Sequence, residues 1–286
     1  MEIIDIHAHA VSKDPIAYPF KPLGGTQSVW TRERPVDGEE LLDWMDKAGI
    51  ARAVVVHAST AYGYDNSYAA DVAAAHPDRL CFVGAIDVQA ADAAERLAYW
   101  VEQRGMAGFR IFAAGLLLSE DSGGWLADPQ TYPAWVKAQE FGTPVCIQTR
   151  FNRLPMLRTL LERFPDVTVI LDHFAQPPSD DGPPYAAARD FFALAAYPNL
   201  YLKLTESNLR TMQQNESTIQ TFMEATIGAF GADRIAWGSN FPQSPGTLVE
   251  LRDFALQELA FLGDAEKTAI FSGTALRLYP QLKAQR

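Results

Sequence analysis

Short apolar runs alternate with helix-like segments along the whole chain, and this alternation constrains the fold more than any other feature. The strand-like runs are residues 3–7, 53–57, 80–86, 108–112, 144–148, 167–172, 200–204 and 234–237. Apolar residues recur at helical spacing in 39–48, 92–104, 132–141, 154–164, 185–196, 217–230 and 247–261. Because the strand-like runs are mostly apolar, they predict a parallel sheet covered on its outer face.

Eight such units in 286 residues, of which 48% are hydrophobic, predict an α/β protein with one domain over residues 1–286. We expect a (β/α)8 TIM barrel. The alternative, a doubly wound open sheet, needs a glycine-rich turn after the first strand, and His9-Ala10-Val11 is not such a turn.

The first strand ends in the sequence Asp5-Ile6-His7-Ala8-His9. Alternate side chains of a strand lie on one face, so Asp5, His7 and His9 should point one way, and Ile4, Ile6 and Ala8 the other. The chain has only five histidines. Two imidazoles at the end of an apolar strand can bind one metal ion or one anionic reaction centre, and they indicate an active site.

Polar residues follow nearly every predicted strand. In a barrel, the carboxyl ends of the strands meet at one mouth, where active sites form. The segment 12–35 is rich in Pro and Gly and is typical of a functional loop over such a mouth. The strand-end residues are His7, His9, His57, Asp87, Arg110, Gln148, Arg150, Asp172, His173, Lys203, Glu206, Ser239 and Asn240.

The charge balance bears on the partners of the chain. A net charge of −11 lacks the basic footprint of a protein that binds nucleic acid. Binding of a small anionic substrate therefore needs local cations, and Arg110 and Arg150 suit a carboxylate because a guanidinium contacts it bidentately. The alternative role of each arginine is a salt bridge to an acid such as Asp87 or Asp172.

The remaining composition predicts a soluble protein of the cytoplasm. Cys81 and Cys146 lie within apolar runs and are expected to be buried thiols of a reducing compartment. The first strand begins almost at Met1, which leaves no room for a signal peptide before it. No run of about 18 apolar residues predicts a membrane span. A homodimer is left open.

Four motifs together resemble the amidohydrolase superfamily, in its "amidohydrolase 2" branch. That branch includes sugar-lactone hydrolases and the pyrone-dicarboxylate and sulfomuconolactone lactonases, and the resemblance covers the whole chain in order and spacing. The opening strand and the last motif are the specific parts. The motifs are Asp5-x-His7-x-His9, Gly108-Phe109-Arg110, Leu171-Asp172-His173 and Trp237-Gly238-Ser239-Asn240-Phe241-Pro242.

The resemblance implies roles for the histidines. His7, His9 and His173 match positions that bind a divalent metal, Zn or Mn, in metal-dependent members, and that polarise the substrate in members without one. Two departures weaken the metal expectation. Gln148 stands where many members have His, and Asn240 stands where the family has an Asp that acts as metal ligand and general base. A neutral amide cannot take a proton from water.

Three explanations of Asn240 stay open. It is natural, with Glu206, Asp87 or a histidine as the base, or it is an engineered Asp→Asn substitution that traps substrate. Otherwise, the chain has lost catalysis and become a binder. Asn240 could still orient water or a carbonyl through its amide.

These features predict a hydrolase that opens a small carboxylated lactone or similar cyclic ester. Arg110 and Arg150 would hold the anion, with His57, Gln148 and Lys203 also in contact with the substrate. The His7, His9 and His173 cluster, or a metal bound to it, would polarise the carbonyl, and Glu206 is the first choice of base. The alternatives are a metal-dependent, non-oxidative decarboxylase of an aromatic acid and a non-catalytic small-molecule binder.

Overall fold

The computed structural model describes residues 1–113 and 124–283. Within these residues, eight parallel strands pair in sequence order, each with the next along the chain. The predicted TIM barrel is therefore confirmed, and every strand begins and ends within two residues of its prediction. The strands are β1 (Ile4–Ala8), β2 (Arg52–Val56), β3 (Leu80–Ala85), β4 (Gly108–Phe112), β5 (Val145–Gln148), β6 (Val169–Asp172), β7 (Leu200–Leu204) and β8 (Ile235–Trp237).

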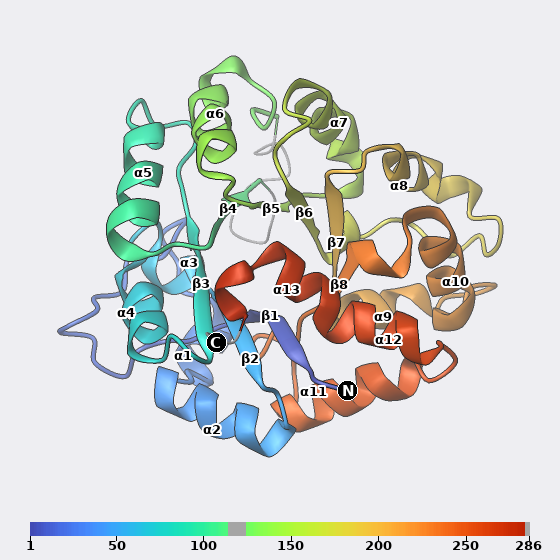
Figure 1. Ribbon diagram of the computed structural model, residues 1–286, viewed down its shortest axis with the longest axis horizontal. Coiled ribbons are helices and arrows are strands. Elements are labelled where there is room, and N and C mark those ends of the chain that lie inside the picture. Colours follow the sequence, from blue (N-terminus) through green and yellow to red (C-terminus); the bar gives the residue numbers. More distant parts are fainter. Residues whose placement is uncertain (114–123, 284–286) are drawn as a thin grey trace.

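Helices surround the strands as an outer ring (Figure 1). Pro, Gly and capping residues set several of their ends; for example, Asp37 caps α2 by accepting a hydrogen bond from the Glu40 backbone N–H, and Gly49 ends it in the left-handed conformation. The described helices are α1 (Val29–Glu33), α2 (Gly38–Ala48), α3 (Ser59–Tyr62), α4 (Ser67–Ala75), α5 (Ala93–Arg104), α6 (Tyr132–Phe141), α7 (Leu154–Arg163), α8 (Arg189–Ala193), α9 (Glu206–Met212), α10 (Ile219–Phe230), α11 (Leu248–Glu258), α12 (Asp264–Thr268) and α13 (Thr274–Leu278).

Backbone hydrogen bonds join β1 to the segment after β8 and so bring the two ends of the sheet together. Asn240 N donates to His7 O, and His9 N donates to Phe241 O, both at 2.8 Å. Asp5 Oδ1 accepts from Ser239 N at 2.9 Å. Gly238 permits this approach, because a Cβ there would lie 2.5 Å from the Cβ of His7. The closure holds His7, His9 and Asn240 beside one another.

A β-bulge in β1 corrects one prediction about its faces. The pairing of β1 with β2 shifts by one residue between Asp5 and Ala8. Ile4 and Ile6 pack in one hydrophobic cluster and Ala8 packs in another. The expectation that these three residues share a face opposite the histidines is therefore wrong, because strict alternation ends at the bulge.

The inner cluster fills the barrel and includes residues of the last helix. Ile4, Val54, Val83 and Ile170 from the strands pack with Tyr279, just after α13. Figure 1 shows α13 lying across the middle of the barrel, at the end where β1 begins. This packing closes the amino-terminal end and leaves the carboxyl-terminal end for a site.

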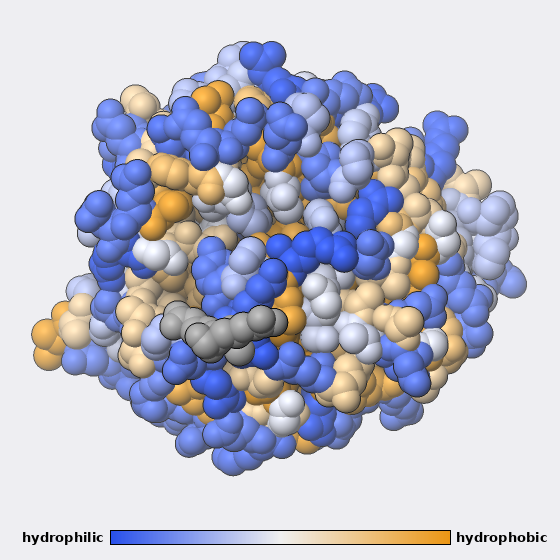
Figure 2. Space-filling model, viewed as in Figure 1, coloured by the Kyte–Doolittle hydropathy of each residue, from blue (hydrophilic) through white to orange (hydrophobic). Residues whose placement is uncertain are grey.

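A second, larger cluster lies between the sheet and its ring of helices, with Phe82, Phe109 and Leu171 from the strands against Leu97 and Trp135. On the face seen in Figure 2, hydrophobic residues appear in small groups among hydrophilic ones. Among the described helices, none is long and apolar enough to cross a membrane.

Candidate active site

A cavity of about 770 Å³ lies at the carboxyl-terminal ends of the strands. Segment 12–35 contributes a wall through residues 26–30, 33 and 34, which include much of α1. The strand-end residues that line the cavity are His9, His57, Arg110, Phe112, Gln148, Arg150, His173 and Asn240. The structure thus brings together at one mouth most of the side chains that the sequence singled out.

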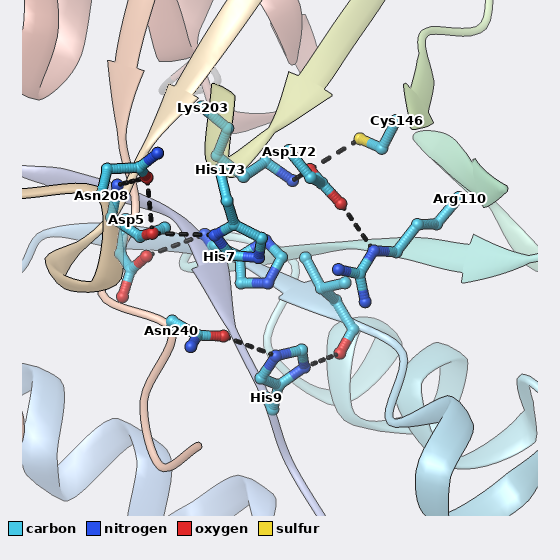
Figure 3. Close-up of polar contacts among 12 residues, drawn as sticks. Asp5, His7, His9, Arg110, Cys146, Asp172, His173, Lys203, Asn208 and Asn240 are labelled. Atoms are coloured by element: carbon cyan, nitrogen blue, oxygen red, sulfur yellow. Dashed lines mark hydrogen bonds and ion pairs between the residues drawn. The ribbon is translucent and has the colours of Figure 1, made fainter. Parts of the chain in front are cut away.

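Three histidines meet at the centre of the barrel (Figure 3). The ring centroids of His7 and His9 are 4.8 Å apart, and those of His7 and His173 are 5.1 Å apart. Burial lowers the pKa of His9 to about 3 and that of His173 to about 4, and it lowers the pKa of His7 well below its ordinary value. Nearby Arg110 and Lys203 add to each shift. All three imidazoles are therefore neutral near pH 7.

Hydrogen bonds determine which nitrogen of His9 carries the proton. Its Nδ1 lies 2.7 Å from the carbonyl oxygen of Val56, which can only accept, so Nδ1 is the donor. The other nitrogen, Nε2, is then an acceptor and lies 3.3 Å from the Asn240 side-chain oxygen. Rotating that amide by 180° presents its N–H to His9 and lets the hydroxyl of Ser244, 3.1 Å from the amide, donate to the oxygen. In this orientation the side-chain N–H of Asn240 donates to Nε2 of His9.

A buried chain of charges stands behind the histidines, from Arg110 through Asp172 to Lys203 (Figure 3). Arg110 Nε donates to Asp172 Oδ2 at 2.6 Å, and Lys203 Nζ lies 2.7 Å from Asp172 Oδ1. Burial alone would raise the pKa of Asp172, but Lys203 and Arg110 hold it well below its usual range. The carboxylate orients the Arg110 guanidinium, and Arg110 lines the cavity.

Three predicted site residues do not line the cavity, and one of them, His7, lies fully buried beside His9 and His173. Lys203 is fully buried, where it contacts Asp172 and the Cys146 thiol, so it lies behind the site rather than beside a substrate. Glu206, the first choice of base, is also buried and pairs with Arg210 on its own helix, α9. Neither is among the residues that surround the cavity.

Arg150 and Gln148 extend the polar wall on the β5 side. Arg150 Nη1 donates to Gln176 Oε1 at 2.7 Å, which holds the guanidinium at the cavity. Sequence reasoning missed Arg34, whose Nη2 donates to the carbonyl oxygen of Pro242 at 2.7 Å and which also lines the cavity. A loop arginine far from any strand end carries no signal in the sequence that would have revealed this position.

Buried polar atoms that have no hydrogen-bond partner among residues 1–113 and 124–283 gather on the cavity wall. Nε2 of His57 donates to the carbonyl oxygen of Gly63, which leaves Nδ1 as an acceptor without a partner. Gln148 Oε1, Gln27 Nε2 and Ser59 Oγ are also without partners, and all four residues line the cavity. Because an unsatisfied buried polar atom is costly, this wall is suited to a polar ligand.

The backbone is strained where His173 and Asn240 enter the site. The segment from His173 to Gln176 has four consecutive residues with φ between 51° and 57°, and Asn240 has a φ of 57°. Each such non-glycine residue costs on the order of 1–3 kcal/mol, and such strain collects at functional sites. The strain supports the view that these two side chains are held for function.

The donor set does not fit the divalent metal that the family resemblance implies. Among the described residues, no group of three His, Cys, Asp or Glu side chains is arranged to hold a metal ion. Nε2 of His9 faces the side-chain amide of Asn240, and the neutral amides of Asn240 and Gln148 stand where metal-dependent members have Asp and His. Three neutral imidazoles beside Arg110 and Lys203 also supply no negative charge to attract a cation.

Comparisons with known proteins agree with this architecture. The chain is 27% identical to an L-fucono-1,5-lactonase of Burkholderia ambifaria, over 96% of this chain and 94% of that protein. It also resembles the crystal structure of a putative 2-pyrone-4,6-dicarboxylic acid hydrolase from Pseudomonas putida, with a TM-score of 0.76, 20% identity and 98% of each chain covered. A manganese-bound dihydroxybenzoic acid decarboxylase from Polaromonas aligns with a TM-score of 0.69 and 18% identity, over 99% of this chain and 98% of that one.

A family model described as "Amidohydrolase" matches residues 4–281. The match runs from the first residue of β1 to the segment after α13, and so includes every strand of the barrel. The expectation drawn from the four motifs is confirmed, and the chain belongs to this amidohydrolase family.

Proposed function

We propose that this protein is a hydrolase that adds water to a small lactone bearing a carboxylate. The observation that carries the proposal is the charge of the cavity. Its lining contains three arginines and one acidic residue among the described residues, namely Arg34, Arg110, Arg150 and Glu33. The lining is therefore positively charged, although the whole chain has a net charge of −11. Such a local excess of guanidinium groups favours an anionic ligand.

The relatives support the same class of reaction. The curated relative is named as a lactonase, and the Pseudomonas structure as a putative hydrolase of a pyrone dicarboxylic acid. Both names describe the opening of a cyclic ester by water, and the second substrate carries carboxylates. A carboxylated lactone agrees with these names and with the arginines of the cavity.

The protonation states of the histidines change the roles that the sequence suggested for them. A neutral imidazole that donates through Nδ1 carries only a lone pair at Nε2, so His9 has no N–H on that side with which to polarise a carbonyl. Arg110 has donors toward the cavity and is the better candidate to stabilise the oxyanion. Arg150 and Arg34 then hold the substrate carboxylate.

A cytoplasmic location also belongs to this proposal. Cys81 and Cys146 are both buried free thiols. Burial raises the pKa of each thiol, which keeps it protonated and unreactive. Two unpaired cysteines support a reducing compartment.

A substrate panel tests the proposal. It contains carboxylated lactones, neutral sugar 1,5-lactones and hydroxybenzoic acids, with proton release and CO2 release measured in parallel. We expect proton release without CO2, and a higher kcat/KM for carboxylated lactones than for neutral ones. Stoichiometric CO2 from an aromatic acid would indicate a decarboxylase instead. Saturable calorimetric binding of a lactone without turnover would indicate a binder.

A further inference from the structure

A chain of hydrogen bonds behind His173 begins at a backbone amide, and this origin fixes the direction of every bond in it. Thr205 precedes helix α9, and its backbone N–H donates to Asn208 Oδ1 at 2.9 Å. A backbone N–H can only donate, so the side-chain amide of Asn208 must present its oxygen rather than its nitrogen.

The Thr205 hydroxyl is the next member of the chain. Its Oγ1 lies 2.8 Å from the same Asn208 oxygen, and two oxygens at this distance bond only if the hydroxyl donates its hydrogen. The hydroxyl has a single hydrogen. Oγ1 can therefore only accept from its other neighbours, the Ser207 hydroxyl at 3.0 Å and His173 Nδ1 at 2.8 Å.

The direction of the last bond sets the tautomer of His173. Since Oγ1 accepts, Nδ1 of His173 carries the ring proton, and Nε2 carries the lone pair. His173 lines the cavity, and Nε2 is the ring nitrogen that Thr205 does not engage. The strained backbone of residues 173–176 holds the ring in this position.

The other cavity histidines are less suited to take a proton from water. Asn240 occupies Nε2 of His9. Nε2 of His57 donates to the Gly63 carbonyl oxygen, and its remaining nitrogen, Nδ1, is a buried atom of the wall. Glu206, Asp172 and Asp5 are tied into pairs or backbone contacts away from the cavity.

We propose that His173 is the general base of the hydrolysis, and that Thr205 and Asn208 are positioning residues that keep its proton on Nδ1. The proposal rests on the lactonase function above. The water oxygen bonds to the lactone carbonyl carbon while one of its protons passes to Nε2 of His173, and Arg110 stabilises the resulting oxyanion. When the ring C–O bond breaks, the departing oxygen takes that proton from Nε2 of His173. The product is one hydroxy acid, and His173 is neutral again.

The tautomer is measured directly by ¹⁵N NMR of histidine-labelled protein, with the His173 signals identified by their loss in His173→Gln. We expect a pyrrole-type Nδ1 and a pyridine-type Nε2 in the unaltered protein and in Thr205→Ser. In Thr205→Val, which removes the hydroxyl, the signals should shift toward the opposite tautomer. Asn208→Ala frees the same hydroxyl to donate to His173 and provides a second variant if the first fails to fold. Thr211→Val is the matched control, since Thr211 lies on α9 and its hydroxyl donates to the Asn208 carbonyl oxygen rather than to the Asn208 side chain.

Kinetics on the same variants test the catalytic part. In Thr205→Val we expect kcat to fall by roughly 10- to 100-fold with little change in KM, as is typical when an orienting partner is removed. Thr205→Ser should recover most of the activity, and Thr211→Val should retain it. An Nε2–H tautomer in the unaltered protein would overturn the proposal, and so would turnover preserved in His173→Gln. If no lactone is turned over, the lactonase function fails, but the NMR measurement still decides the tautomer.

Discussion

At the scale of single residues, Asn240 controls the hydrogen bonding of His9. A carboxylate at this position has no N–H to offer Nε2, so it would favour a protonated His9 and would place a negative charge in the cavity. We expect Asn240→Asp to raise the pKa of His9 above its value of about 3, and to lower kcat/KM for an anionic lactone by at least about tenfold. NMR titration and steady-state kinetics measure the two effects.

A gain in activity in Asn240→Asp would instead support the explanation that Asn240 is an engineered substitution of an Asp. A positioned carboxylate base contributes about 10²–10⁴-fold to a rate, so a gain of that size in Asn240→Asp would indicate that the present residue blocks catalysis. Asn215→Asp, at an exposed turn, controls for the added charge alone.

Arg110 and His57 both line the cavity but should differ in importance. Arg110 is a buried cation oriented by Asp172, whereas His57 is anchored to Gly63 and forms part of the wall. Removing one partner of a desolvated charge pair costs roughly 2–5 kcal/mol, so Arg110→Ala should reduce kcat/KM at least about 30-fold more than His57→Ala does. Steady-state kinetics with any lactone that is turned over compares them. Equal losses would mean that Arg110 serves only its ion pair.

At the scale of elements, Gly238 allows β8 to approach β1. An added Cβ would lie 2.5 Å from His7 Cβ and 2.9 Å from its backbone nitrogen, so Gly238→Ala must displace β1. We expect a loss of about 1–3 kcal/mol in the free energy of unfolding, together with reduced activity. Gly228→Ala is the matched control. It lies within α10 with nothing within 4 Å of the added carbon, and should gain about 0.5–1 kcal/mol. Denaturant unfolding of both variants measures the difference, and an unaffected Gly238→Ala would contradict this view of the closure.

The elements differ in how well the sequence predicts them. The strands were predictable because each is a short, mostly apolar run between segments with helical spacing. Helix α4 was missed because its alanines, as in Ala73 and Ala74, give no periodic contrast between faces. The bulge in β1 was missed because it depends on the pairing with β2, which no single strand encodes.

The sequence predicted the positions of the site residues better than it predicted their side-chain contacts. Positions at strand ends follow from the fold, and most of those predicted line the cavity. Side-chain partners do not follow from it. Lys203 turns toward Asp172, and Glu206 toward Arg210. The contact of Thr205 with His173 joins residues that are 32 positions apart in the chain, and no local pattern predicts it.

At the scale of the whole molecule, the buried histidines make stability depend on pH. Burial lowers the pKa of His57 and of His173 to about 4, and that of His9 to about 3, from 6.5. Below pH 6.5 these histidines therefore bind protons in the unfolded chain. In the folded protein they bind protons only near their lower pKa values of about 3 to 4. The stabilisation is fully present above pH 6.5 and is lost as the pH falls. Asp5, whose pKa burial raises, has the opposite effect at the acidic end of this range.

We therefore expect the free energy of unfolding to fall between pH 6.5 and about 4.5 by about 1.4 kcal/mol per pH unit for each such histidine. Denaturant unfolding at pH 7.5, 6.5, 5.5 and 4.5 measures this slope. His7, whose pKa burial also lowers, adds to this slope, so replacing one of the four, as in His57→Gln, should remove about a quarter of it. A flat profile would contradict this prediction. It would mean that these imidazoles bind protons as readily in the folded protein as in the unfolded chain.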